Sequence, residues 1–334
     1  MIISKTPFRI SFLGGGTDYP DYYLQNGGSV LATTFDKYCY ISIRVLPPFF
    51  DHKYRIVYSK IENASKIDQI KHPAVKAALN YTKVTEGLEI HHDGDLPARS
   101  GLGSSSSFTV GLINAISALK GEFIGKRGLA LASLNLEQNV LKEAVGSQDQ
   151  ISAAFGGLNR INFTTDGSFS VLPVILSLDR RTEFESNLML FFTGVTRLSV
   201  GIAKQKIANV KLNIKNLDMM KEMVDHGISI LGNNSTPLSE FGELLHESWT
   251  RKKELAEDVS NPIIDAMYEA GIDAGATGGK LLGAGAGGFM LFYVEKEYQQ
   301  GVKNKLKKYV HVPIKFESMG SSICVYQPEN FNVK

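Results

Sequence analysis

The feature that most constrains this chain is a run of glycines and serines placed directly before an apolar segment. It reads Pro97-Ala-Arg-Ser-Gly-Leu-Gly-Ser-Ser-Ser-Ser-Phe108. Residues 110–119 then repeat apolar side chains at a helical period, which predicts a glycine-rich turn that opens a helix. The first N–H groups of a helix have no partner within it, and they lie at the positive end of the helix dipole. The turn is therefore suited to hold a phosphate.

The same turn has two simpler interpretations, namely a flexible Gly/Ser loop or serines that only cap the helix. Two other glycine-rich turns weigh against them: Gly14-Gly-Gly-Thr-Asp18 after a predicted strand, and Lys280-Leu-Leu-Gly-Ala-Gly-Ala-Gly-Gly288 before one. Glycine lets a backbone approach an anion closely, so three such segments favour a shared ligand site over unrelated turns. The chain contains neither the P-loop pattern nor the protein-kinase catalytic-loop pattern, so a nucleotide would be held by a different loop.

The order of predicted elements indicates an α+β protein of two domains. A chain of 334 residues is long for one core. A charged segment at residues 179–186 marks the expected boundary, which gives domains of residues 1–184 and 185–334. In the second domain we expect one long helix over residues 202–231 and strands that close the chain.

Charge and composition exclude several classes of partner. A net charge of +2 gives no reason to expect nucleic acid or an anionic membrane. The sequence shows no apolar run of the length of a bilayer span and no signal-peptide pattern at its start. Cys39 and Cys324 match no metal-site spacing and suit a reducing compartment. We therefore expect a cytoplasmic monomer or homodimer that acts on small molecules.

Four charged residues stand out beside these turns. Arg9 and Asp18 flank the first glycine turn, where an arginine can pair with anions and an aspartate can accept from hydroxyls. Glu137 lies among apolar neighbours on a predicted helix; it is a solvated residue, or a magnesium ligand if it faces the Ser105 region. Asp149, between two glutamines, is either a helix cap or a positioned carboxylate.

The three glycine segments resemble the three motifs of the GHMP kinase family, which includes galactokinases, homoserine kinases and mevalonate kinases. Pro97 to Ser105 is similar to the phosphate-binding motif, Thr6 to Asp18 to the first motif and Lys280 to Phe289 to the third. The match is collinear and spans essentially the whole chain. The resemblance implies an N-terminal α/β domain and a C-terminal ferredoxin-like domain, with the active site between them.

The resemblance also implies ATP and Mg²⁺ as cofactors and gives each site residue a role. Asp149 aligns with the catalytic aspartate, the expected base for the sugar hydroxyl, while Ser105 and Glu137 align with magnesium ligands. The ATP phosphates would lie on Gly101, Leu102, Gly103, Ser104, Ser105 and Ser106. The sugar site would contain Arg9, Gly15, Gly16, Thr17 and Asp18, with Gly283 and Gly285 closing over the substrate.

Within the family, the triple glycine before Thr17-Asp18 and the segment Asp36-Lys37-Tyr38 most resemble the D-glycero-D-manno-heptose 7-phosphate kinases. Those enzymes phosphorylate the anomeric hydroxyl on the route to nucleotide-activated heptose for surface polysaccharides. Galactokinases carry Gly-Glu-His-Thr-Asp where this chain has Gly-Gly-Gly-Thr-Asp, which disfavours galactose. The alternatives are a fucokinase- or galactokinase-like sugar kinase and a non-catalytic sugar sensor, although a sensor has no need to keep Ser105, Glu137 and Asp149 together.

A sugar phosphate carries its own dianion, which the protein must meet with a cation. The candidates outside the glycine–serine turn are Lys37, Arg44, Arg160 and Arg197. We expect Arg197 to be the contact, because it follows a glycine turn at the start of the second domain and is best placed to reach a cleft between the domains.

Overall fold

The structure, a computed structural model, describes residues 1–98, 100–195 and 200–328 and contains two β-sheets. The strands of the larger sheet are β1 (Ile2–Leu13), β2 (Gly28–Val45), β3 (Tyr54–Val57), β4 (Ile61–Ala64), β5 (Leu88–Gly94), β6 (Asn159–Phe163), β7 (Phe169–Pro173), β12 (Phe316–Glu317) and β13 (Ser322–Tyr326). Their main path runs β13-β1-β2-β5-β3-β4, while β6 and β12 also pair with β2, and β7 pairs with β6.

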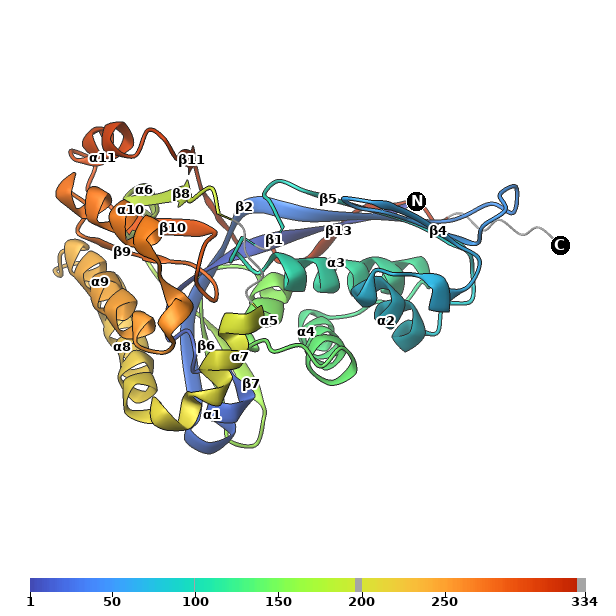
Figure 1. Cartoon of the computed structure of the whole chain (residues 1–334), viewed down its shortest axis with the longest axis horizontal. Helices are drawn as coiled ribbons and strands as arrows, with labels where there is room; N and C mark the ends of the chain where they lie inside the picture. Colours follow the sequence, from blue (N-terminus) through green and yellow to red (C-terminus); the bar gives the residue numbers. More distant parts are fainter. Residues whose placement is uncertain (99, 196–199, 329–334) are drawn as a thin grey trace.

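Helices α2 (Pro73–Thr82), α3 (Ser104–Leu119) and α4 (Lys126–Leu134) lie together on one side of this sheet (Figure 1). The predicted helix after the glycine–serine turn is α3, and its side chains from Ser106 to Ser117 are all buried. It packs on β1 and β2, so its first turn is fixed relative to the strand that carries Arg9. The short helix α1 (Pro20–Asn26) follows the first glycine turn, and α5 (Gln148–Phe155) carries Asp149.

The smaller sheet has the order β11-β8-β10-β9, from β8 (Leu188–Phe192), β9 (Gly278–Leu281), β10 (Phe289–Tyr293) and β11 (Val310–Val312). Of the helices in this part of the chain, α6 (Leu178–Ser186), α9 (Ser239–Lys253) and α10 (Pro262–Asp273) contact this sheet, and α11 (Gln299–Lys305) contacts α10. Helix α8 (Ile214–Gly232) packs on α9 and on β1 and β2 of the larger sheet, while α7 (Val200–Ala208) lies beside α5 (Figure 1). The dipeptide Asn261-Pro262 in the sequence predicts the start of a helix, with asparagine as N-cap and proline in the first turn. Asn261 does cap α10, because its side chain accepts from the N–H groups of Ile263 and Ile264.

The expectation of one helix over residues 202–231 is wrong. The chain forms α7, a short 3₁₀ turn and then α8. The interruption lies between Asn209 and Asn213, whose side-chain amides both donate to the carbonyl of Leu255. Asparagine side chains that bond to backbone groups compete with helical hydrogen bonds, and they separate the two helices here.

The charged segment at the expected boundary is also helical. It forms α6, which begins at Ser177 as N-cap. Arg180 on this helix donates to the carbonyl of Ile230 near the end of α8 and to that of Thr236 in the segment after it, so α6 is joined to the second half of the chain.

The strands that close the chain do not join the smaller sheet as expected. Strand β13 pairs with β1, and β12 pairs with β2. The division at residues 184 and 185 therefore separates these two strands from the sheet that they complete.

A shared aromatic core also connects the halves, because Phe12 of β1 packs against Phe184 and Phe241 with ring centroids 5.4 and 5.7 Å away. Among the described residues, no helix is both long and apolar enough to cross a membrane.

Candidate active site

A cavity of about 190 Å³ lies where the first two glycine turns meet the third. Most of the residues singled out from the sequence line it: Arg9, Gly15, Gly16, Asp18, Gly101, Gly103, Ser104, Ser105, Ser106, Asp149 and Gly283. Leu102 is fully buried behind the turn, and its carbonyl accepts from the N–H of Arg9 at 3.1 Å. The cavity therefore brings together side chains from segments far apart in the sequence.

The glycine–serine turn presents the first turn of α3 to this cavity. Gly103 is the N-cap of α3 and has a φ of 75°, a left-handed conformation that favours glycine. A Cβ at Gly103 would lie 3.3 Å from Oδ2 of Asp149. The N-terminus of α3 and the carboxylate of Asp149 are thus immediate neighbours.

Asp149 does not stand alone, because Arg9 holds it at two points. Nε of Arg9 donates to Oδ1 of Asp149 at 2.7 Å, and Nη2 donates to Oδ2 at 2.8 Å. The third point of the guanidinium, Nη1, donates to the carbonyl of Gly101 at 2.8 Å. Arg9, which is only 5% exposed, therefore connects β1, the glycine turn and α5.

Glu137 lies behind the serines on a π-helical turn, η2 (Asn135–Val140), and is fully buried. Its Oε2 accepts from the hydroxyl of Ser106 at 2.9 Å and from Nε2 of Gln150 at 2.5 Å. The Oε1 atom has no hydrogen-bond partner among the described residues. Burial raises the pKa of Glu137 to about 7, although the side chains of Thr109, Gln150 and Ser106 act to lower it. A nearby cation would favour the charged carboxylate.

The serine that reaches Glu137 is therefore Ser106, one residue after the expected Ser105. Ser105 is exposed and lines the cavity, since successive residues on a helix point about 100° apart. A buried carboxylate with a free oxygen beside a helix N-terminus fits Mg²⁺, which is commonly bound by one or two carboxylates together with phosphates. No group of three or more His, Cys, Asp or Glu residues suited to a metal occurs in the described part of the chain, so a site made of protein ligands alone is not formed there.

Asp18 of the first glycine turn is 2% exposed and accepts from the N–H of Gly16 at 2.9 Å. Burial raises its pKa above the ordinary value. Thr17, expected in the sugar site, turns away instead: its buried hydroxyl lies 2.8 Å from the carbonyl oxygen of Gly14 and 2.9 Å from that of Ser29. Thr17 thus shapes the turn, whereas Asp18 lines the cavity.

The third glycine cluster touches the glycine–serine turn backbone to backbone. A Cβ at Gly283 would lie 2.4 Å from the Cα of Gly101, a distance that no side chain tolerates. Gly285 packs against the backbone of Val259, where a Cβ would lie 2.8 Å from the Val259 Cα, so it does not face the cavity. Glycine is needed at 283 because the two halves approach so closely there.

Comparison with known proteins places this geometry in a family. Residues 69–157 match the model of the GHMP kinases N terminal domain, and residues 234–312 match that of the GHMP kinases C terminal domain. The chain is 30% identical over 319 residues to the D-glycero-alpha-D-manno-heptose 7-phosphate kinase of Campylobacter jejuni, covering 92% of this chain and 93% of that protein. The chain belongs to the GHMP kinase family. It is accordingly a phosphotransferase, and the expected two-domain fold is confirmed.

Two other proteins extend the comparison of this GHMP kinase. The crystal structure of a D-glycero-D-manno-heptose 1-phosphate kinase from Bacteroides thetaiotaomicron superposes with a TM-score of 0.72 at 25% identity, covering 98% of this chain and all of that one. The L-fucokinase/L-fucose-1-P guanylyltransferase of Bacteroides fragilis is 27% identical over 343 residues, which is 91% of this chain and 35% of that longer protein.

Sequence reasoning missed the main cations of this GHMP kinase site. Three lysines that it did not single out, Lys206, Lys252 and Lys280, line the cavity. Lys280 begins the third glycine motif, which is a signal that the sequence offered. Lys206 and Lys252 lie on helices without any motif, so only their burial in the folded chain distinguishes them.

The basic residues that the sequence did favour are engaged elsewhere. Lys37, Arg44 and Arg160 form ion pairs with Asp36, Glu89 and Asp225, respectively. None of the three lines the cavity as far as the structure describes it. Arg197 lies outside the described residues, so its assignment as the phosphate contact stays a prediction.

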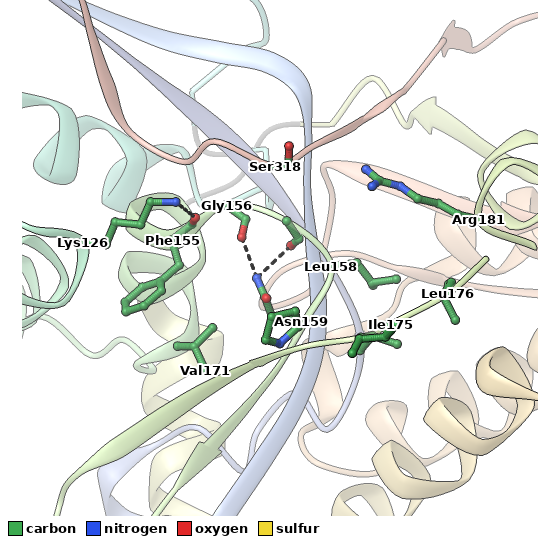
Figure 2. Close-up of a pocket in the computed structure, with 13 residues that line it drawn as sticks. Lys126, Phe155, Gly156, Leu158, Asn159, Val171, Ile175, Leu176, Arg181 and Ser318 are labelled. Atoms are coloured by element: carbon green, nitrogen blue, oxygen red, sulfur yellow. Dashed lines mark hydrogen bonds between the residues drawn. The ribbon is translucent and has the colours of Figure 1, made fainter. Parts of the chain in front are cut away.

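A second cavity of about 410 Å³ in the GHMP kinase has a different character (Figure 2). It lies beside β6 and β7, and apolar side chains such as Val171, Ile175 and Leu176 form much of its wall. Its polar groups bond to nearby backbone: Nζ of Lys126 donates to the carbonyl of Phe155 at 2.7 Å, and Asn159 to that of Gly156 at 2.6 Å. Although larger, this cavity contains none of the carboxylates or glycine turns that phosphate transfer requires.

Proposed function

We propose that this GHMP kinase transfers the γ-phosphate of ATP to the anomeric hydroxyl of D-glycero-D-manno-heptose 7-phosphate. The product would be the 1,7-bisphosphate, a precursor of nucleotide-activated heptose. The observation that carries the reaction type is the convergence of the α3 N-terminus, Glu137 and Asp149 at one cavity. The relative from Campylobacter jejuni, similar along nearly its whole length, supports the choice of sugar.

The nucleotide phosphates would lie against the first turn of α3. Backbone N–H groups from Gly101 to Ser106 and the helix dipole would hold them there. Glu137, through its free Oε1, and the hydroxyl of Ser105 or Ser106 would hold Mg²⁺. A magnesium ion supplies charge neutralisation to the phosphate oxygens during transfer.

Asp149 would accept the proton of the attacking hydroxyl. A carboxylate offers about four acceptor positions, and Arg9 uses two of them, so capacity remains for the sugar. The two-point contact fixes the carboxylate beside Gly103, next to the proposed position of the γ-phosphate. Asp18, Gly15 and Gly16 would line the sugar side of the same cavity.

An assay of ATP consumption over a panel of acceptors tests this function. We expect turnover with heptose 7-phosphate to exceed turnover with mannose 6-phosphate, fucose and galactose. Higher kcat/KM for any unphosphorylated sugar would overturn the proposed acceptor, and dependence on a phosphate donor other than ATP would overturn the proposed donor.

A fucokinase-like activity is the second candidate. The similarity to the fucokinase protein of Bacteroides fragilis spans 91% of this chain and favours it. Fucose lacks a phosphate, so the same panel separates the two acceptors by comparing kcat/KM with L-fucose and with heptose 7-phosphate.

A further inference from the structure

Three lysines from the second half of the chain are buried in one wall of the active-site cavity. Lys206 of α7, Lys252 of α9 and Lys280 of β9 are 7%, 6% and 2% exposed, respectively. Lysine is almost never buried in this way unless it is paired with an opposite charge. Three such residues at one cavity therefore require an explanation.

The ammonium groups are held by neutral oxygens. Nζ of Lys206 donates to the carbonyl of Ala284 at 2.5 Å, and Nζ of Lys252 donates to those of Leu281 and Gly283, both at 2.6 Å. Nζ of Lys280 donates to the carbonyl of Phe12 at 2.6 Å and lies 3.3 Å from the hydroxyl of Ser248. These contacts orient the lysines without neutralising them. Within the described residues they also leave each ammonium at least one N–H for a ligand.

The groups that face this cluster do not supply a negative charge to match each lysine. None of the three lysines forms an ion pair with a carboxylate in the described part of the chain. Arg9 also faces Lys252 and Lys280, but its charge is engaged by Asp149. Asp18 is the acidic group that acts on Lys206.

Burial lowers the pKa values of all three lysines, and repulsion between the lysines lowers those of Lys252 and Lys280 further. Burial lowers the pKa of Lys206 to about 8 and that of Lys280 to about 7, with repulsion from Lys206 adding to the effect on Lys280. The pKa of Lys252 is lowered by burial and then by the other two lysines and Arg9. If this part of the cavity wall were only structural, apolar side chains would give a more stable fold, because an uncompensated buried charge is strongly unfavourable.

The position of the lysines relative to α3 indicates which anion they meet. The helix N-terminus, on the first half of the chain, already provides for the nucleotide phosphates. All three lysines come from the second half of the chain, on α7, α9 and β9, and Lys206 lies close enough to Asp18, on the proposed sugar side, for that carboxylate to act on it. The lysines can therefore meet a second anion that enters with the acceptor.

We propose that Lys206, Lys252 and Lys280 form the binding site for the acceptor's own phosphate group. The ligand chemistry is a phosphate monoester dianion bound by three charge-assisted N–H···O contacts. The inference rests on the proposed function in one respect, namely that the acceptor is a sugar phosphate. It assigns the 7-phosphate to this cluster. The three lysines, all from the second half of the chain, would then select phosphorylated over unphosphorylated sugars.

Steady-state kinetics with paired acceptors test the site. Lys206→Met and Lys252→Met are compared with wild type on heptose 7-phosphate and on the same heptose without phosphate, at saturating ATP. We expect KM for the 7-phosphate to rise about 10- to 100-fold, whereas KM for the unphosphorylated sugar and for ATP stays unchanged. Lys126→Met is the matched control, because Lys126 also donates to a backbone carbonyl but lines the other cavity.

Two kinetic outcomes would overturn the inference. An unchanged KM for the 7-phosphate in both variants would show that the lysines do not hold it. An equal fall in kcat with both acceptors, calculated per molecule of enzyme that binds ATP, would show that they act on the transferred phosphoryl group instead. Because both acceptors are tested on the same variant, a partly misfolded preparation lowers both activities alike and leaves the ratio of their KM values interpretable.

A binding measurement separates failure of this site from failure of the proposed function. With a non-hydrolysable ATP analogue and Mg²⁺ bound, so that the γ-phosphate position beside the α3 N-terminus is occupied, inorganic phosphate should raise the melting temperature of wild type and not that of Lys252→Met. If phosphate stabilises only the wild type but heptose 7-phosphate is not turned over, the proposed acceptor is rejected and the anion site is supported. Equal stabilisation of wild type and variant by phosphate would reject the anion site.

Discussion

Arg9 and Asp149 form a two-point ion pair that crosses from the first strand to the helix behind the glycine–serine turn, with N···O distances of 2.7 and 2.8 Å. The pair joins residues 140 positions apart in the sequence. Its consequence is that the carboxylate beside Gly103 has a defined orientation before any ligand arrives. A planar guanidinium fork imposes such a geometry, whereas a lysine ammonium at this position would act as a point charge.

Asp149→Asn tests the role proposed for this carboxylate. An amide keeps the shape and accepts from Arg9 through its oxygen but cannot take up the hydroxyl proton. We expect kcat to fall by about 10²- to 10⁴-fold, while ATP and sugar phosphate still bind. Single-turnover kinetics and equilibrium binding measure the two properties separately. Asp225→Asn, which breaks an Arg–Asp pair outside the cavity, is the control; turnover of Asp149→Asn within a few-fold of wild type would remove Asp149 from the base role.

Glu137→Gln tests the proposed magnesium site. The amide retains the bond from Ser106 but offers Mg²⁺ no negative charge, so the concentration of Mg²⁺ for half-maximal rate should rise by at least about 10-fold. Glu247→Gln, on the exposed side of α9, should leave the Mg²⁺ titration unchanged. A titration of Glu137→Gln that overlays wild type would make Glu137 a structural residue.

The same substitution has an effect on stability without magnesium. Because burial raises the pKa of Glu137 from 4.5 to about 7, the native state holds more protons than the unfolded chain between these values, and stability falls as pH rises through this range. Above about pH 7, Glu137→Gln should therefore be more stable than wild type, by up to about 3 kcal/mol. Urea unfolding in the presence of a chelator measures the difference.

Gly283→Ala tests the contact between the two halves. The added Cβ would lie 2.4 Å from the Cα of Gly101, so one of the glycine turns must move. A displacement of this kind beside the reacting groups should lower kcat/KM on the order of 10²-fold. Gly232→Ala, where the new Cβ meets no atom within 4 Å, is the matched control. Unchanged kinetics for Gly283→Ala would show that this contact does not position the site.

The sequence predicted the parts of the site that depend on local backbone chemistry. The glycine–serine turn and the helix α3 were found in this way, because glycine clusters and helical periodicity are local signals. Local patterns left a structural role open for Glu137 and for Asp149, and only the family resemblance gave them roles in the site. The sequence also predicted the cap of α10 at Asn261, since capping needs only neighbouring residues.

Contacts between residues that are far apart in the sequence could not be predicted from local sequence patterns. Nothing around Arg9 indicates that its partner is Asp149, and nothing around Lys206 or Lys252 indicates that helices carry them into the cavity. The return of β13 to β1 depends equally on the whole fold. The sequence also did not show that Ser106 is the serine that hydrogen-bonds to Glu137, because this depends on the rotation of residues about the axis of α3. The assignment of Ser105 as a magnesium ligand stays a prediction.

The buried lysines predict an unusual pH dependence of stability. The pKa of Lys206 is lowered from 10.5 to about 8 and that of Lys280 to about 7, so the unfolded chain binds more protons than the native state above these values. The free energy of unfolding should consequently rise from about pH 7 to about pH 9, by at most about 1.4 kcal/mol per pH unit for each lysine. Urea unfolding in phosphate-free buffer measures it, and Lys206→Met should reduce the slope. A slope of zero or below for wild type would contradict the burial of these charges.

The central claim is that one cavity, between the turn before α3 and the glycines after β9, holds both reactants. A crystal structure with a non-hydrolysable ATP analogue, Mg²⁺ and the sugar phosphate tests it most directly. The account predicts the β- and γ-phosphates at the N–H groups of residues 103–106, the anomeric hydroxyl within hydrogen-bond reach of Asp149, and the sugar's phosphate on the three lysines. A triphosphate bound elsewhere, for example in the cavity beside β6 and β7, would contradict it.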